Sequence, residues 1–326
     1  MVTRRTLVKG LATAPVLGSI AMSAPRAVAQ DDAVGVGSKN FPEALVIGEM
    51  YALALENAGL TVDRRLNLGG TGVAHEALLA GDIDLYPEYT GTGLLAVLGA
   101  TLADVVGPVA SPTAGASASP VATDAVDAVY NYVNQQYQEQ FGLVWLDQSP
   151  MNNSQALAVT RDFADEYGLT TISQLAELAG DEDIVISAPS DFEERDDGLL
   201  GLQAVYGGGF ENVEVNGVDP GIKYVALTDG DANVVLAFTT DAEIAFFDLV
   251  VLEDDLGLWP PYHVAPVVRQ DTLDANPLIG ETLNTLSPFL TTEVMIDLNG
   301  LVVGEEKQDP ADVARQFLVD QQLISE

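Results

Sequence analysis

Two basic and two aromatic side chains stand where predicted strands end, and together they suit a ligand that carries both charges. Lys39 follows the strand-like run "AVGVGS" and Arg195 follows "DIVISAPS", while Tyr89 and Phe238 each end another such run. Arginine pairs with a carboxylate through a planar fork and lysine pairs as a point charge. An aromatic face attracts a quaternary ammonium by roughly 0.5 to 2 kcal/mol per ring. These residue types favour a small molecule with a carboxylate at one end and a bulky cation at the other.

The two cations also have an ordinary interpretation. Arg195 has Glu193 and Glu194 on one side and Asp196 and Asp197 on the other. A surface cation that balances neighbouring acids needs no ligand, so this alternative stays open for Arg195 and, by the same reasoning, for Lys39.

A repeated spacing relates the two halves of the chain. A shift of 149 residues aligns Gly81-Asp82 with Gly230-Asp231, Asp84 with Asn233, Tyr89 with Phe238, and Thr90 with Thr239. Ligands of open parallel sheets bind outside the carboxyl ends of the strands. Two equivalent lobes that face each other therefore place Tyr89 and Phe238 across one cleft. The alternative is a chance similarity around a common Gly-Asp turn.

The elements that must position these side chains form two series of alternating strands and helices. In the first series Pro42 suits the first turn of a helix and Gly59 suits its end. This alternation predicts an α/β fold with largely parallel sheets. We predict an export signal at 1–29, a first lobe at 30–150, a second lobe at 151–261, and a return to the first lobe at 262–326. The Ala/Ser/Pro-rich residues 107–123 are typical of a flexible surface insertion.

The N-terminus indicates export. Arg4 and Arg5 precede a moderately apolar run, and "AVA" at 27–29 resembles a cleavage site, so we predict a twin-arginine signal that is cut after Ala29. A membrane anchor is the alternative, but Lys9 and Pro15 interrupt the run. Cleavage changes the net charge from −36 to −40 and leaves nine basic residues. We therefore expect a periplasmic or cell-surface protein, peripheral to the membrane.

Composition excludes several classes of function. With 13 Lys and Arg against 49 Asp and Glu, the chain lacks the basic surface that nucleic acid or anionic lipid requires. The absence of cysteine excludes disulfides, thiolate metal sites and a lipidated cysteine. The two histidines, His75 and His263, belong to no catalytic motif, and there is no phosphate loop. We expect neither an enzyme nor a bound metal or cofactor, and we expect a monomer.

Long motifs resemble a known family. The segment from "VGSKNF" through "DLYPEYTGTGL" is similar to the glycine betaine, carnitine and choline substrate-binding proteins of osmoprotectant ABC importers. The similarity continues through "NNSQALAV" and "FTTDAEIAFFDLVVLEDDLGLWPPYHVAPVVR". It covers nearly all of the chain after residue 29 except the insertion.

The resemblance implies a two-lobed type II periplasmic-binding-protein fold with a central ligand cleft and a hinge. In this family an aromatic box holds the trimethylammonium group, and a lysine, an arginine and a threonine hold the carboxylate. The implied ligand-binding residues are Lys39, Tyr89, Thr92, Asn153, Gln155, Arg195, Phe238 and Tyr262. The implied partners are a quaternary-ammonium ligand and a membrane permease. Glycine betaine is the expected ligand, with proline betaine, carnitine, choline or another small zwitterion or amine as alternatives.

Some positions depart from the family pattern. Phe238 stands where tyrosine is common and keeps the aromatic face. Gln155 stands where an aromatic residue is expected and offers an amide oxygen instead of a ring, which weakens one wall or makes room for a larger head group. Asn153 stands where an acid occurs in some members. Trp259 and His263 flank Tyr262, and we expect them to be structural rather than part of the box.

Overall fold

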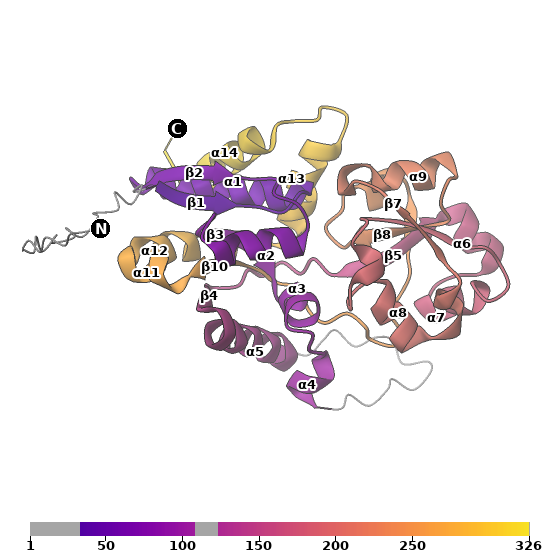
Figure 1. The fold of residues 1–326 in the computed structure, drawn as a ribbon. Coiled ribbons are helices and arrows are strands. Elements are labelled where there is room, and N and C mark those ends of the chain that lie inside the picture. The colour runs from indigo at the N-terminus through magenta and orange to yellow at the C-terminus, as the bar shows by residue number, and fades with distance from the viewer. Residues whose placement is uncertain (1–32, 108–122, 326) are drawn as a thin grey trace, which may run out of the picture. The chain divides into compact units, whose positions relative to one another are not determined.

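The structure is a computed structural model that describes residues 33–107 and 123–325. The predicted export signal at 1–29 lies outside the described residues, and so does the predicted insertion apart from its two end residues. The remaining chain forms two five-stranded sheets, each with its own helices (Figure 1).

The first sheet has the strand order β2-β1-β3-β10-β4, and the second has the order β7-β6-β8-β5-β9. The strands of the first sheet are β1 (Ala33–Gly37), β2 (Thr61–Arg65), β3 (Leu85–Tyr89), β4 (Leu143–Trp145) and β10 (Val264–Arg269). Those of the second are β5 (Gln155–Thr160), β6 (Val185–Ala188), β7 (Glu214–Gly217), β8 (Val234–Phe238) and β9 (Leu249–Val251). The predicted α/β class is confirmed.

Both sheets are mixed, whereas the sequence predicted largely parallel ones. In the first sheet β1 pairs in parallel with β2 and β3, and β10 pairs antiparallel with β3 and β4. In the second sheet β6 pairs in parallel with β7 and β8, and β5 pairs antiparallel with β8 and β9. The antiparallel strands β5 and β10 are those that the chain enters directly from the other sheet, without a crossover helix that would turn them parallel.

Helices accompany both sheets. With the first sheet are α1 (Pro42–Asn57), α2 (Thr71–Ala80), α5 (Thr123–Phe141), α11 (Gln270–Ala275), α12 (Leu278–Asn284), α13 (Thr292–Val303) and α14 (Pro310–Asp320). With the second are α6 (Arg161–Tyr167), α7 (Ile172–Leu178), α8 (Leu199–Tyr206) and α9 (Lys223–Asp229). Shorter elements are α3 (Thr90–Thr92), α4 (Leu102–Val106), α10 (Glu243–Phe246), η1 (Gly93–Val97), η2 (Phe192–Glu194), η3 (Gly208–Glu211), η4 (Pro220–Ile222) and η5 (Ser287–Phe289).

Local sequence explains where the helices that carry the site begin and end. Pro42 opens α1, where its missing N–H costs no hydrogen bond. Gly81 closes α2 with a left-handed φ of 77°, and Gly230 closes α9 with a φ of 82°. Such a backbone favours glycine, which has no Cβ. The two Gly-Asp pairs that the 149-residue shift aligned therefore serve as the same helix stop in both halves.

Strand β3 delivers side chains to both faces of the first sheet. Leu85 and Tyr89 join the apolar cluster that includes α1, and Tyr86 joins the opposite cluster with α2 and α5. This is the alternation expected of a strand buried on both faces. Tyr86 is fully buried within that cluster.

Pro87 lies in the middle of β3, although proline has no backbone N–H to donate to a neighbouring strand. Pro87 is paired with Pro266 of β10. The Arg269 N–H donates to the Asp84 carbonyl, and the Thr90 N–H donates to the His263 carbonyl. Because hydrogen-bonded and non-hydrogen-bonded pairs alternate along an antiparallel ladder, Pro87 and Pro266 form a non-hydrogen-bonded pair. The proline nitrogen thus faces β1, which pairs with β3 no further than Leu85. A central proline therefore leaves no ladder bond unmade.

Two segments connect the sheets, one between β4 and β5 and one between β9 and β10. They run antiparallel beside each other, because Asn152 forms a bridge with His263 and the Asn153 N–H donates to the Tyr262 carbonyl at 3.0 Å. Within the described part of the chain, no individual helix has the length and hydropathy of a membrane span. Two consecutive helical segments, Leu278–Phe289 and Thr292–Val303, have this length and hydropathy only when they are taken together, and the angle between them is 92°.

Candidate functional site

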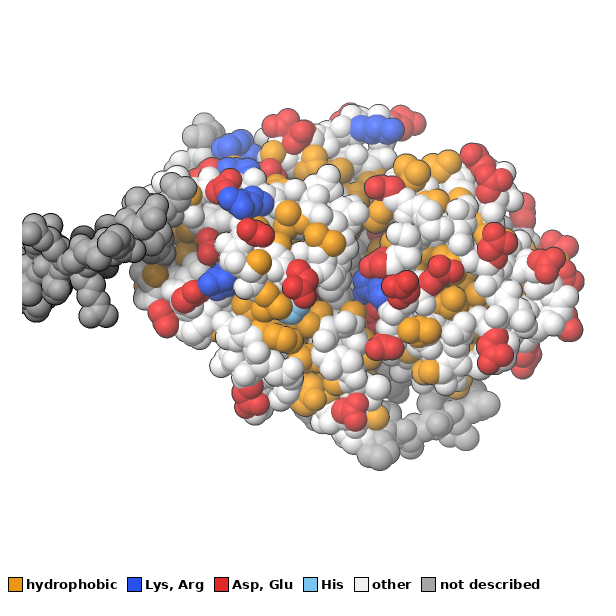
Figure 2. All heavy atoms as spheres, viewed as in Figure 1, with side chains coloured by type: hydrophobic (Ala, Val, Ile, Leu, Met, Phe, Trp, Pro, Cys, Tyr) orange, Lys and Arg blue, Asp and Glu red, His pale blue; other side chains and the backbone are white. Residues whose placement is uncertain are grey.

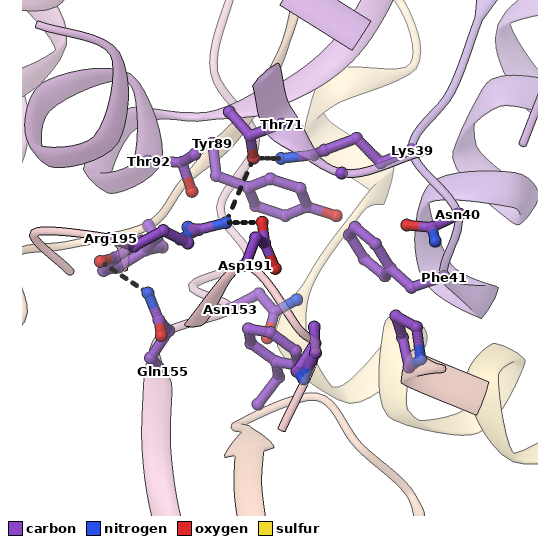
Figure 3. Close-up of a pocket in the computed structure, with 15 residues that line it drawn as sticks. Lys39, Asn40, Phe41, Thr71, Tyr89, Thr92, Asn153, Gln155, Asp191 and Arg195 are labelled. Atoms are coloured by element: carbon purple, nitrogen blue, oxygen red, sulfur yellow. Dashed lines mark hydrogen bonds and ion pairs between the residues drawn. The ribbon is translucent and has the colours of Figure 1, made fainter. Parts of the chain in front are cut away.

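All eight sequence-predicted site residues line a single pocket (Figure 3). Lys39, Tyr89 and Thr92 come from the first sheet and its loops, Gln155, Arg195 and Phe238 come from the second, and Asn153 and Tyr262 come from the connecting segments. The pocket is also lined by Asn40, Phe41, Gly70, Thr71, Pro189, Asp191 and Pro220. Residues up to 223 positions apart in the chain therefore line one pocket. They meet there because β3 and β8 end at the pocket and β5 begins at it.

Phe41 was missed by sequence reasoning and completes the aromatic part of the pocket. Its ring centroid lies 6.1 Å from that of Tyr89 and 6.1 Å from that of Phe238, with an interplanar angle of 18° to Phe238. The predicted relation of Tyr89 to Phe238 across the pocket is thus mediated by a third ring between them. The sequence could have pointed to Phe41, because it ends the "GSKNF" motif and directly follows Asn40.

Lys39 is a buried, paired cation rather than a free one. It is 4% exposed, and its Nζ donates to Glu88 Oε1 at 2.5 Å and to Thr71 Oγ1 at 3.5 Å. The same ammonium lies 4.8 Å from the Tyr89 ring centroid. Burial lowers the pKa of Lys39, and the neighbouring Glu88 opposes that shift. The alternative of an exposed surface cation is therefore wrong for Lys39.

Arg195 has one end of its guanidinium fixed and the other directed into the pocket. Its Nε and Nη2 donate to the two carboxylate oxygens of Asp197 at 2.6 Å each. Its Nη1 donates to Thr71 Oγ1 at 3.4 Å and to Asp191 Oδ2 at 3.3 Å (Figure 3). Burial lowers the pKa of Arg195, but pairing with Asp197 outweighs burial and the net shift is upward. Nη1 is the part of this fork that can turn to a ligand carboxylate.

Asp197 fixes three pocket residues at once. Besides Arg195, its Oδ2 accepts from Gln155 Nε2 at 2.7 Å and from the Tyr262 hydroxyl at 3.3 Å. Trp259 Nε1 donates to its backbone carbonyl at 2.9 Å. Asp197 is fully buried, so this carboxylate is a structural partner. Asp197, one of the acids that flank Arg195 in the sequence, thus orients its guanidinium group.

Gln155 stands where an aromatic residue was expected, and its hydrogen bonds explain why an amide fits this position. Its Nε2 donates to Asp197 and, at 3.3 Å, to the Tyr262 hydroxyl. A side chain without a donor, such as phenylalanine, could not make this bond to the carboxylate, and Gln155 forms a polar wall of the pocket.

Glu43 lies behind the aromatic part of the pocket. Its Oε1 accepts from the Tyr89 hydroxyl at 2.7 Å and from Asn153 Nδ2 at 2.6 Å, and its Oε2 accepts from Asn299 Nδ2 at 3.0 Å. Burial raises the pKa of Glu43, and these hydrogen bonds oppose the rise. The amide oxygen of Asn153 is buried and has no hydrogen-bond partner among the described residues. Asn153 is thus oriented by Glu43 and retains one acceptor.

Thr71 and Asp191 were also missed. Thr71 is the first residue of α2 and directly follows the sequence "LGG" at 68–70. Trp259 and His263 do not line the pocket; Trp259 bonds to Asp197, and His263 Nδ1 lies 2.9 Å from the Ser149 carbonyl. Both are structural, as predicted. Among residues 33–107 and 123–325, no three His, Cys, Asp or Glu side chains form a group able to hold a metal.

Two mixed α/β sheets joined by paired segments, with a pocket lined from both, define a solute-binding protein of the periplasmic type. A family model described as the substrate binding domain of ABC-type glycine betaine transport systems matches residues 32–320. The chain belongs to this family, whose members are binding proteins rather than enzymes.

Individual relatives agree with this assignment. The chain is 31% identical over 295 residues to the ergothioneine transport permease/ergothioneine binding protein EgtU of Helicobacter pylori, covering 90% of this chain and 48% of that protein. The chain thus spans about half of EgtU. It is 28% identical over 307 residues to the glycine-betaine-binding protein of Pseudomonas aeruginosa, covering 92% and 91%. A crystal structure of a glycine betaine/carnitine/choline ABC transporter protein has a TM-score of 0.62 at 27% identity, covering 90% of this chain and 100% of that one.

Proposed function

We propose that this chain is an exported receptor that captures a quaternary-ammonium betaine and delivers it to a membrane permease of an ABC importer. Residues 30–150 and 262–326 form the first lobe and residues 151–261 form the second. The two paired connecting segments are the hinge on which the lobes close. Residues 1–29 are the export signal, so the receptor works outside the cytoplasm.

The observation that carries this proposal is the division of one pocket into two chemically different ends. Phe41, Tyr89, Phe238 and Tyr262 supply aromatic faces, and Asn153 Oδ1, which has no hydrogen-bond partner within 33–107 and 123–325, adds an acceptor. A trimethylammonium group binds well against such faces, because the quadrupole of each ring attracts a cation that water holds only weakly.

The opposite end of the pocket supplies donors. Arg195 Nη1 and the Thr71 hydroxyl lie 3.4 Å apart, and Thr92 also lines the pocket. A carboxylate placed between them accepts charge-assisted hydrogen bonds. Lys39 contributes a second positive charge, because its Nζ donates to the same Thr71 hydroxyl at 3.5 Å and lies 4.8 Å from the Tyr89 ring centroid. Glycine betaine carries a trimethylammonium group and a carboxylate joined by one methylene, and it is the ligand we propose.

Isothermal titration calorimetry with glycine betaine, proline betaine, carnitine and choline tests the proposal. We expect glycine betaine to bind more tightly than choline, which has no carboxylate for Arg195. Choline binding far more tightly than every betaine would contradict the assigned carboxylate end. Thermal unfolding with each ligand gives an independent readout, because a ligand that binds the native state raises the melting temperature.

A second candidate ligand class is supported by Gln155. Its amide replaces a ring, so one wall of the pocket is polar and can contact a head group larger or more polar than glycine betaine. The relative EgtU is named for ergothioneine rather than for glycine betaine. Betaines of larger amino acids therefore belong in the same binding panel.

A further inference from the structure

The buried carboxylates around the ligand pocket differ in the charge of their partners. Among the residues that the structure describes, the buried acids are Glu43, Glu88 and Asp197. Lys39 donates to Glu88, and Arg195 donates to both oxygens of Asp197. The hydrogen bonds that Glu43 accepts all come from uncharged side chains. Because a buried carboxylate is costly without a compensating positive charge, Glu43 suits a cation that arrives with a ligand.

Glu43 reaches the pocket through two of its lining residues. Its Oε1 accepts from the Tyr89 hydroxyl at 2.7 Å and from Asn153 Nδ2 at 2.6 Å. The Tyr89 hydroxyl points away from Arg195 in Figure 3, so the carboxylate lies at the aromatic end of the pocket. Donation to a carboxylate polarises the donor group, which increases the electron density of the phenol ring and of the amide oxygen. Both side chains therefore pass part of the Glu43 charge to the pocket.

The surroundings of the aromatic rings are otherwise positive. Lys39 Nζ lies 4.8 Å from the Tyr89 ring centroid, and Lys223 Nζ lies 4.1 Å from that of Phe238. Each ammonium already forms a salt bridge with an acid of its own. The N-terminus of α1, which begins directly after the pocket residue Phe41, adds a partial positive charge. A ligand cation among these rings needs a further negative charge, and the first-turn carboxylate of α1 supplies it.

We infer that Glu43 is the counter-ion of the trimethylammonium group, and that it acts through Tyr89 and Asn153 to select a cation over a neutral group of the same shape. This inference rests on the proposed function, because it takes the position of the trimethylammonium group from it. It goes further in assigning charge selectivity to a residue outside the pocket lining. A ligand cation favours the ionised form of Glu43, which burial alone disfavours.

The test compares glycine betaine with tert-butylacetate, which has the same shape but a carbon in place of the cationic nitrogen. By calorimetry, we expect the parent to bind glycine betaine at least about tenfold more tightly. Glu43→Gln should weaken glycine betaine about tenfold and leave tert-butylacetate within about twofold of the parent value. Glu56→Gln removes an exposed carboxylate from the same α1, so it is the matched control and should change neither affinity.

A second variant exchanges the acid and the amide. Glu43→Gln combined with Asn153→Asp keeps the net charge and a donor–acceptor pair between the two side chains, but it moves the carboxylate into the pocket lining. This double variant should recover the glycine betaine affinity that Glu43→Gln loses. It tests the inference with glycine betaine alone, so the result does not depend on how weakly tert-butylacetate binds.

The inference is overturned if the parent binds the two ligands equally, or if Glu43→Gln weakens both to the same extent or neither. It is also overturned if the double variant binds glycine betaine no more tightly than Glu43→Gln does. Failure of the parent to bind glycine betaine would instead overturn the proposed function itself.

Discussion

Thr90 and Thr239 make the same three hydrogen bonds in the two halves of the molecule. The Thr90 hydroxyl accepts from the His263 N–H at 3.0 Å and donates to the Pro261 carbonyl at 2.9 Å, and the Thr90 N–H donates to the His263 carbonyl at 3.0 Å. Thr239 repeats these bonds on the other connecting segment, with Ser154 and Asn152, at 3.0 Å each. Each sheet is therefore fastened by one threonine to one connecting segment.

Thr90→Val and Thr239→Val should consequently destabilise the protein by similar amounts. Each valine leaves a backbone N–H and a backbone carbonyl without the hydroxyl partner, and buried unpaired groups cost roughly 1 to 3 kcal/mol. Urea unfolding of both variants checks this. Thr228→Val is a control, because its hydroxyl donates only to the Val225 carbonyl within α9 on the exposed surface. A large loss in one of the two variants with none in the other would contradict their equivalence.

Asp197→Asn should weaken glycine betaine binding at least about tenfold, since the amide no longer holds the Arg195 fork at two oxygens. Choline has no carboxylate for Arg195 to bind, so its affinity should fall less. Calorimetry with both ligands separates this positioning effect from a general loss of structure. Asp196→Asn, at the exposed neighbouring acid, is the matched control. Equal losses for both ligands would argue against a role through Arg195.

Lys39→Met should lower the free energy of unfolding by about 3 to 5 kcal/mol, because it leaves the fully buried Glu88 carboxylate without its cation. The double variant with Glu88→Gln should recover much of that loss. A double-mutant cycle from urea unfolding measures the coupling between the two side chains. Additive losses in the cycle would show that the ion pair is not the source of the effect.

Tyr89→Ala should reduce betaine affinity at least about tenfold, because it removes an aromatic face from the pocket. Tyr89→Phe keeps the face and should retain most of the binding. It should nevertheless lower the free energy of unfolding by roughly 1 to 3 kcal/mol, because Glu43 loses the hydroxyl that donates at 2.7 Å. Calorimetry and urea unfolding of both variants distinguish the roles of ring and hydroxyl, and equal losses of binding would contradict the aromatic role.

Glu43 should make stability depend on pH in a predictable direction. Burial raises its pKa above the ordinary value of 4.5, so the folded protein keeps a proton that the unfolded chain has released. Stability from this group is therefore present below pH 4.5 and is lost as pH rises through the folded pKa. The difference in unfolding free energy between the parent and Glu43→Gln, followed by urea unfolding from about pH 4 to 8, should change with that sign. A constant difference would contradict the raised pKa.

Local sequence was sufficient to predict most helices and strands and many of the residues that line the pocket. Pro42 and the Gly-Asp pairs predicted helix boundaries because their backbone restrictions act within a few residues. The 149-residue shift predicted equivalent positions, and the structure supports this with the same paired bonds: the Asp84 carboxylate accepts from the Gly35 N–H at 2.7 Å, and the Asn233 side chain accepts from the Val185 N–H at 2.8 Å. Motif resemblance supplied Thr92, Asn153, Gln155 and Tyr262, whereas Phe41, Thr71 and Asp191 were missed.

The tertiary structure decided the ion-pair partners and the other contacts of those residues. Lys39 reaches Glu88 and Arg195 reaches Asp197 because strand register and loop path bring them together, and spacing alone gave no preference among the many acids of this chain. Phe41 lies between Tyr89 and Phe238 for the same reason. The position of Pro87 inside β3 likewise depended on how far β1 extends, which is a property of the sheet rather than of the segment. Sequence thus determined which residue types were available, and long-range packing determined which of them meet.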